Sequence, residues 1–333
     1  MKYNIASGPH THGGDSSSSL MYQVILALLP TSLFGLYVFG VSALLVLLTA
    51  SISALLAESI MLYWRGVNQS SLFDGSALLT GWLLALSLPP ATPLWIVALG
   101  SFFAIAIGKH AYGGLGQNLF NPAMLARVML LICFPVELTD WHAATPPVLT
   151  ETGLDLNPYW LGIDAISSAT PLAAEAPMLA VRSLWFGHHA GSLGETSALF
   201  ILLGGLFLLW RKVINWVIPT AVLLGLALPA LLLHAIKPDQ FLSASTHLFS
   251  GAVFLAAFFI ATDMVTSPVS VKGQWVFGLG CGLLIFLIRT FGNYPEGVAF
   301  SVLIMNATTP LIDHYLRPAV FGSRPKWFKE ERA

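Results

Sequence analysis

The stretch Met21–Gly40, MYQVILALLPTSLFGLYVFG, contains no charged residue and is almost entirely apolar. About 20 such residues are what a helix needs to cross the hydrocarbon layer of a membrane. The residues before it are polar, and the apolar run is too long for the short apolar region of a cleaved signal peptide. The stretch therefore predicts a retained transmembrane helix at the start of the chain.

The composition of the whole chain agrees with a membrane protein. Charged residues are 9% and apolar residues 56% of the 333 residues, with a mean hydropathy of +0.76. A soluble domain has roughly 25% charged residues. The net charge of −1 gives no sign of nucleic-acid binding. The two cysteines, Cys133 and Cys281, lie in apolar segments without a CxxC spacing, so they predict buried small side chains and no iron–sulfur or zinc site.

Apolar runs between polar breaks predict an all-α integral membrane protein with about ten transmembrane helices. The expected spans are 21–40, 42–63, 75–90, 92–108, 119–136, 197–211, 215–236, 248–265, 275–291 and 297–315. The spans at 75–90 and 197–211 are short, which is typical of tilted, re-entrant or broken helices.

Lysine and arginine positions predict the orientation of these spans. With a cytoplasmic N-terminus, eleven non-membrane basic residues fall inside: Lys2, Arg65, Lys109, Arg211, Lys212, Lys272, Arg317, Arg324, Lys326, Lys329 and Arg332. Two, Arg182 and Lys237, fall outside. This positive-inside bias predicts cytoplasmic termini. The expected parts are a first membrane half at 1–136, an acidic outer loop at 137–196, a second membrane half at 197–316 and a basic cytoplasmic tail at 317–333.

The two halves resemble each other weakly. The segment 76–90 matches 250–263, and the Gly-rich break 112–118 matches 291–297. Because each half has five spans, the second copy enters the membrane from the opposite side, which gives two inverted five-helix repeats. A chance resemblance between Gly-rich membrane helices is the alternative.

The outer loop contains the run Asp164-Ala165-Ile166-Ser167-Ser168-Ala169-Thr170. By itself the pattern is typical of an Asp/Ser/Thr turn or a helix cap. Its small side chains, and Pro171 after the threonine, also suit an extended, exposed loop that a modifying enzyme can reach. The residues alone leave both interpretations open.

Four segments together resemble the RnfD membrane component of the Rnf ion-translocating electron transport complex and its relative, the NqrB component of the sodium-pumping NADH:quinone reductase. They are Ser7–His12, the run GGLGQNLFNPA at 113–123, Asp164–Thr170, and Tyr294–Phe300. Leu119 and Met264 stand where the family often has proline, and Ala165 and Ser168 where it often has glycine. The resemblance covers most of the chain.

This resemblance implies a flavoprotein of the bacterial inner membrane. FMN would be joined to Thr170 through a phosphoester by a flavin transferase, with Asp164, Ser167, Ser168 and Ala169 as the attachment motif. The complex would transfer electrons between NADH and ferredoxin and move Na⁺ or H⁺. The implied partners are a second subunit with covalent flavin, iron–sulfur subunits and membrane lipid. A second, non-covalent flavin such as riboflavin is an open alternative.

Charged groups within spans are costly and are usually functional or paired. Asp263 and Glu58 are therefore candidates for an ion path, and a structural ion pair is the alternative for each. Arg127 and Arg289 also lie in spans. The histidine pairs His10/His12 and His188/His189 lack further ligands at metal-binding spacing, so no metal site is expected. The rival function is a channel or secondary transporter of the same inverted plan without a redox role.

Overall fold

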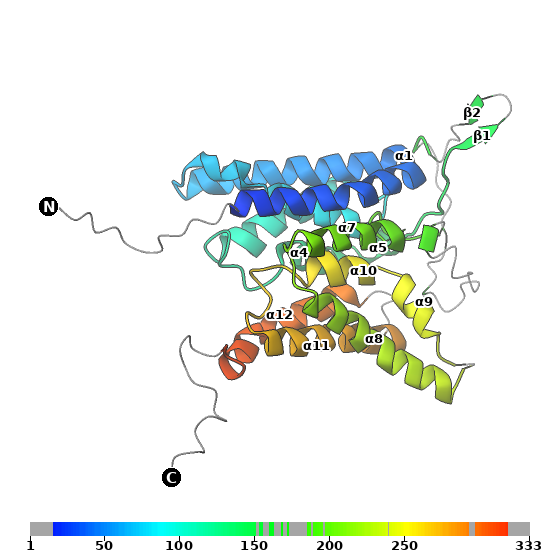
Figure 1. Cartoon of the computed structure of the whole chain (residues 1–333). Coiled ribbons are helices and arrows are strands. Elements are labelled where there is room, and N and C mark those ends of the chain that lie inside the picture. Colours follow the sequence, from blue (N-terminus) through cyan, green and yellow to red (C-terminus); the bar gives the residue numbers. More distant parts are fainter. Residues whose placement is uncertain are drawn as a thin grey trace, which may run out of the picture.

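The longest helix, α1 (Ser17–Trp64), contains the apolar run Met21–Gly40. The chain reverses direction at Gly40, the last residue of that run. Gly40 has φ 68° and ψ −139°, which breaks the helix into two antiparallel halves (Figure 1). The Tyr22 hydroxyl at one end of α1 donates to the Phe73 carbonyl just beyond the other end, at 3.2 Å. A side chain cannot replace this glycine, because a Cβ would strike the Trp160 carbonyl.

This computed structural model describes residues 16–150, 153–155, 160–162, 168, 172, 185–187, 189–195, 197–238, 240–292 and 297–318. Figure 1 shows α1 beginning and α12 (Val298–Tyr315) ending at one end of the bundle, here named the terminal end. The short strands β1 (Val148–Thr150) and β2 (Gly153–Asp155) pair antiparallel at the opposite end, named the loop end.

The first half continues with short elements. These are η1 (Gln69–Asp74), α2 (Ser76–Ser87), α3 (Leu94–Phe103), the π-helix η2 (Ala104–His110), α4 (Pro122–Cys133) and α5 (Pro135–Thr139). Helix α2 has 12 residues, and at 1.5 Å per residue it is about 18 Å long. That is shorter than a hydrocarbon layer of about 30 Å.

The second half consists of α7 (Ala198–Trp210), α8 (Val217–Ile236), α9 (Ala244–Phe249), α10 (Val253–Leu255), the π-helix η3 (Ala256–Ile260), α11 (Val271–Phe291) and α12. The predicted span 248–265 is thus interrupted. Its helical part, α10 and η3, ends in the turn that contains Asp263. The other predicted spans each correspond to one helix, to one half of α1, or to the continuous α3–η2.

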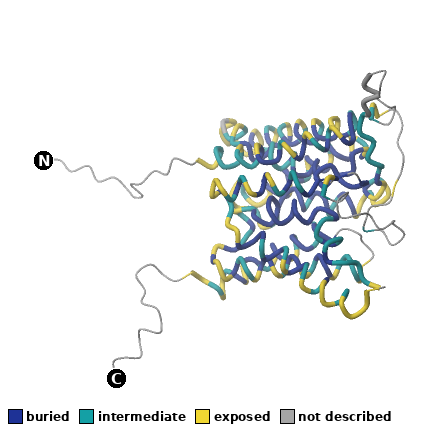
Figure 2. Tube along the Cα trace, turned by 45° about the vertical axis from the view of Figure 1, so that its right-hand side comes forward, coloured by how far each residue is buried: buried dark blue, intermediate teal, exposed yellow. Residues whose placement is uncertain are grey.

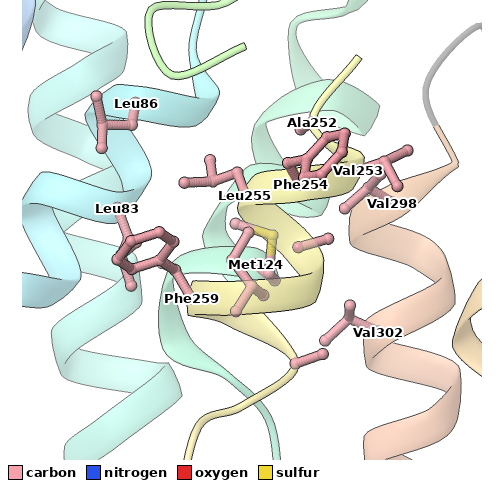
Figure 3. Packing of buried hydrophobic residues seen from close by; sticks show 14 of the residues in the cluster. Leu83, Leu86, Met124, Ala252, Val253, Phe254, Leu255, Phe259, Val298 and Val302 are labelled. Atoms are coloured by element: carbon pink, nitrogen blue, oxygen red, sulfur yellow. The ribbon is translucent and has the colours of Figure 1, made fainter. Parts of the chain in front are cut away.

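The short helices meet in the middle of the bundle. Figure 3 shows Leu83 of α2, Met124 of α4, Phe259 of η3 and Val302 of α12 packed around one core, all of them buried. Buried residues fill the interior, and exposed residues lie along the outer flanks and at the ends (Figure 2). Many exposed side chains on the flanks are large and apolar, including Leu33, Leu56 and Leu232. Such a surface suits lipid.

The structure confirms the predicted helical class, and its apolar helices are consistent with a membrane protein. Among the described residues, α1, α8 and α11 are long and apolar enough to cross a membrane, while α2, α3–η2, α4 and α7 are apolar but shorter. The β1–β2 hairpin lies in the predicted outer loop and is the exception to the all-α class. Cys281 is buried as expected, but Cys133 at the end of α4 is exposed.

Candidate functional site

A buried ion pair lies near the terminal end. The Lys109 ammonium at the end of η2 donates to Glu58 Oε1 of α1 at 2.7 Å, and each side chain is only 3% exposed. His110 Nε2 lies 3.0 Å from the other carboxylate oxygen, without the alignment of a hydrogen bond. The expectation that Lys109 is a cytoplasmic loop cation is therefore wrong: its charge is needed to balance Glu58 inside the bundle.

Further polar groups extend this pair in two directions. Lys109 also donates to Ser76 Oγ at 2.7 Å, and Ser76 Oγ donates to the Asp74 carboxylate. On the other side, Arg65 Nη1 donates to His110 Nδ1 at 3.0 Å. Because a guanidinium has only donors, this contact places the proton of a neutral His110 on Nε2. The network thus joins α1, α2 and η2.

The Gly-rich break after η2 is attached to the same network. Arg65 Nη2 donates to the Gly113 carbonyl at 2.8 Å. Gly113, Gly114 and Gly116 all have positive φ, which other residues rarely adopt. The break ends where Asn121 caps α4 by accepting hydrogen bonds from the amides of residues 123 and 124. The break is therefore a tight connection that leads from η2 into α4.

A cavity of about 340 Å³ lies beside this break. Its walls come from both halves: α1, α2, η2 and the break on one side, and α7, η3 and the turn after η3 on the other. Leu83, Phe258 and Phe259 supply apolar wall, and Lys109 and Asn118 supply polar groups. The Asn118 side-chain oxygen is buried and has no hydrogen-bond partner among the described residues. The cavity therefore suits a mainly apolar ligand with a few polar edges.

Asp263 lies on the opposite wall of this cavity, in the turn after η3. Its carboxylate accepts hydrogen bonds from the Val265 amide at 3.3 Å and the Thr266 hydroxyl at 3.1 Å. No basic side chain within 4 Å of it occurs in the described part of the chain. Asp263 and Glu58, the two predicted ion-path residues, therefore differ: one has a cationic partner, and the other has hydroxyl and amide donors.

A second polar cluster lies at the loop end. Arg289 of α11 donates to the His247 carbonyl of α9 at 2.8 Å. Glu195 is buried and accepts from the amide and hydroxyl of Ser192. Arg289 and Glu195 both approach the α-carbon of Gly251, which has φ +72° and no room for a side chain. Burial, and then the Arg289 charge, lower the pKa of His247 to about 4, so this imidazole is neutral at pH 7.

Most of the predicted flavin motif lies outside the described residues, namely Asp164, Ser167, Ala169 and Thr170. Ser168 is described: it is exposed, and its amide donates to the Trp141 carbonyl at 2.8 Å.

Lys109, His110 and Glu195 are among the residues of the polar clusters that the sequence did not predict as site residues. A signal for Lys109 was present, because the carboxylate of Glu58 in a span requires a cation nearby.

Comparison with known proteins gives one consistent family. A family model described as "NQR2, RnfD, RnfE family" matches residues 4–322. Among curated relatives, the D component of the ion-translocating oxidoreductase complex of Stutzerimonas stutzeri is 47% identical over 92% of each chain. The proteins with the same name from Halorhodospira halophila and Escherichia coli O127:H6 are 44% and 45% identical, covering 96% and 97% of this chain and 95% and 99% of their own lengths. The chain therefore belongs to the NQR2, RnfD, RnfE family.

Proposed function

We propose that this chain is the membrane flavoprotein subunit of an ion-translocating oxidoreductase complex, with FMN covalently attached to Thr170. The observation that carries the proposal is the similarity to components of such complexes over nearly the whole chain, together with the Asp164–Thr170 pattern in a polar loop. The complex couples electron transfer between NADH and ferredoxin to Na⁺ or H⁺ transport. The flavin supplies the redox chemistry, and the protein supplies its position and surroundings.

Thr170 is tested by mass spectrometry and by fluorescence of the denatured band in a gel. We expect an FMN ester on the peptide that contains Thr170, and no fluorescence after Thr170→Ala. The matched control is Thr139→Ala, because Thr139 is an exposed threonine near the start of the same loop. An unmodified Thr170 peptide from cells that contain the flavin transferase contradicts the proposal, and it favours a channel or transporter without a redox role.

We also propose that the chain folds as two inverted five-helix repeats, with both termini in the cytoplasm of a bacterial cell. Two short elements support this plan. Helix α2 begins at the terminal end, beside Lys109, while α10–η3 begins at the loop end, beside Arg289. The two therefore run in opposite directions through the centre of the bundle, as equivalent elements of inverted repeats do. Arg65, Arg211, Lys212 and Lys272 flank helix ends at the terminal end, which agrees with a cytoplasmic position.

A second, non-covalent flavin such as riboflavin fits the cavity between the halves. Phe258, Phe259 and Leu83 would cover an aromatic ring system, and the unpaired Asn118 oxygen would accept from a ring N–H. Lys109 would donate to a ring oxygen or nitrogen. Such a flavin would accept and release electrons at the terminal end. Denaturing Thr170→Ala protein should release free flavin, and adding Asn118→Leu should lower its amount; a flavin-free Thr170→Ala protein excludes the second site.

Of the two candidate carboxylates for an ion path, Asp263 is better placed than Glu58. The Glu58 charge is balanced by Lys109, so this carboxylate has a structural task already. Asp263 faces the cavity and has no cation within 4 Å among the described residues. Asp263→Asn should reduce ion uptake into vesicles relative to the electron-transfer rate, with the complex still assembled. Full coupled transport in this variant removes Asp263 from the path.

A further inference from the structure

An asparagine in the middle of α12 has no hydrogen-bond partner, although it is almost completely buried. Asn306 is 1% exposed, and both its amide oxygen and its amide nitrogen lack a partner among the described residues. A primary amide has two N–H donors and two acceptor lone pairs. Leaving them unsatisfied in a protein interior is expensive, and such groups in native proteins commonly meet an ion or an internal water.

The neighbours of Asn306 show where this amide lies. Val302, one turn earlier on the same face of α12, packs beside η3 and α4 (Figure 3). Thr309, one turn later, donates to the Thr266 carbonyl at 3.0 Å. Asn306 lies between these two contacts. It therefore faces the region where η3 ends and the turn with Asp263 begins.

This region is rich in oxygen, and no described basic side chain lies within 4 Å of Asp263. Thr266 links the two sides, because its hydroxyl donates to Asp263 Oδ2 and its carbonyl accepts from Thr309. In membrane transporters, the ends of interrupted helices coordinate small cations. No salt bridge to Asp263 occurs in the described part of the chain. A carboxylate, an amide oxygen and hydroxyl oxygens are the ligands that hard cations prefer.

We propose that Asn306 is a ligand of a partly hydrated monovalent cation, held between α12 and the turn after η3, with Asp263 and Thr266 as its anionic and hydroxyl neighbours. The amide oxygen contacts the cation, and the amide nitrogen donates to a water of its hydration shell. The inference deepens the proposed function, since it gives the transported cation a binding position behind η3. It does not depend on whether FMN is attached to Thr170.

The test is the thermal stability of the purified complex in NaCl, KCl or choline chloride at equal ionic strength. A cation that binds only the folded protein raises Tm with its concentration. We expect Na⁺ or K⁺ to raise Tm above the value in choline. Asn306→Leu, which keeps the side-chain volume but removes the ligand, should weaken the apparent cation affinity on the order of tenfold. Asn306→Asp should retain or strengthen it.

Two controls keep the result specific. Ser101→Ala removes another fully buried hydroxyl without a partner among the described residues, in the first half, and should leave the cation effect unchanged. In-gel flavin fluorescence of the Asn306 variants should equal that of the original protein, which separates this inference from the flavin proposal. An equal Tm in choline and in both metal salts overturns the cation site and leaves internal water as the occupant. An Asn306→Leu protein with undiminished cation affinity overturns it as well.

Discussion

Replacing Lys109 by methionine tests whether the charge of Glu58 is structural. The two side chains are each 3% exposed, and the ammonium lies 2.7 Å from the carboxylate. Methionine has a similar length and no charge, so Lys109→Met leaves a buried carboxylate whose remaining contact is His110. Removing one partner of a buried ion pair destabilises a protein by about 3–5 kcal/mol. We expect a loss of that size in the free energy of unfolding.

A double-mutant cycle separates the charge from the packing. Glu58→Gln combined with Lys109→Met removes both charges, so no buried charge is left without a partner. The double variant should be less destabilised than the sum of the two single variants, with a coupling energy of roughly 2–3 kcal/mol. Lys272→Met is the matched control, because Lys272 is exposed and its loss should change the unfolding free energy by less than about 0.5 kcal/mol.

Reversible unfolding by SDS in mixed micelles, followed by tryptophan fluorescence, measures these free energies. Ion uptake per assembled complex is measured alongside, because a structural pair predicts lower stability with unchanged coupling in the protein that remains folded. Additive losses in the double variant, or a loss below about 1 kcal/mol in Lys109→Met, would refute the ion pair as the structural role of Glu58.

Three further outcomes are expected. Reporter fusions should place Ala333 in the cytoplasm and Asn157 outside it, and two reporters on the same side would contradict the topology. Gly40→Ala should destabilise the protein by at least about 2 kcal/mol in the same SDS assay, because φ is 68° and a Cβ would strike the Trp160 carbonyl; an unchanged value would refute the tight reversal. Lys212→Gly should stabilise it by up to about 1 kcal/mol, since Lys212 has φ 57° at the end of α7, and a loss of stability would reveal a contact of the lysine side chain.

The interruption of the span 248–265 shows why a hydropathy pattern cannot describe every helix. The apolar run is continuous from Val253 to Ala261, and a pattern of apolar residues does not distinguish one spanning helix from α9, Gly251 and the short α10–η3. The break depends on Gly251, whose backbone has φ +72° and whose missing Cβ leaves space for the side chains of Arg289 and Glu195. Those two residues come from α11 and from the loop before α7, so local sequence gives no sign of their approach.

The apolar character of the bundle, the positions of most helices and the basic character of the terminal end follow from the sequence alone. The first two depend on how apolar each segment is, and the third depends on where lysines and arginines lie between the segments. Both are properties of short stretches of sequence. The partner of Glu58, the cavity between the halves and the unsatisfied amide of Asn306 were decided only by the tertiary structure. Each depends on the depth and rotation at which helices distant in the sequence meet: Lys109 follows Glu58 by 51 residues, yet their charged atoms are 2.7 Å apart.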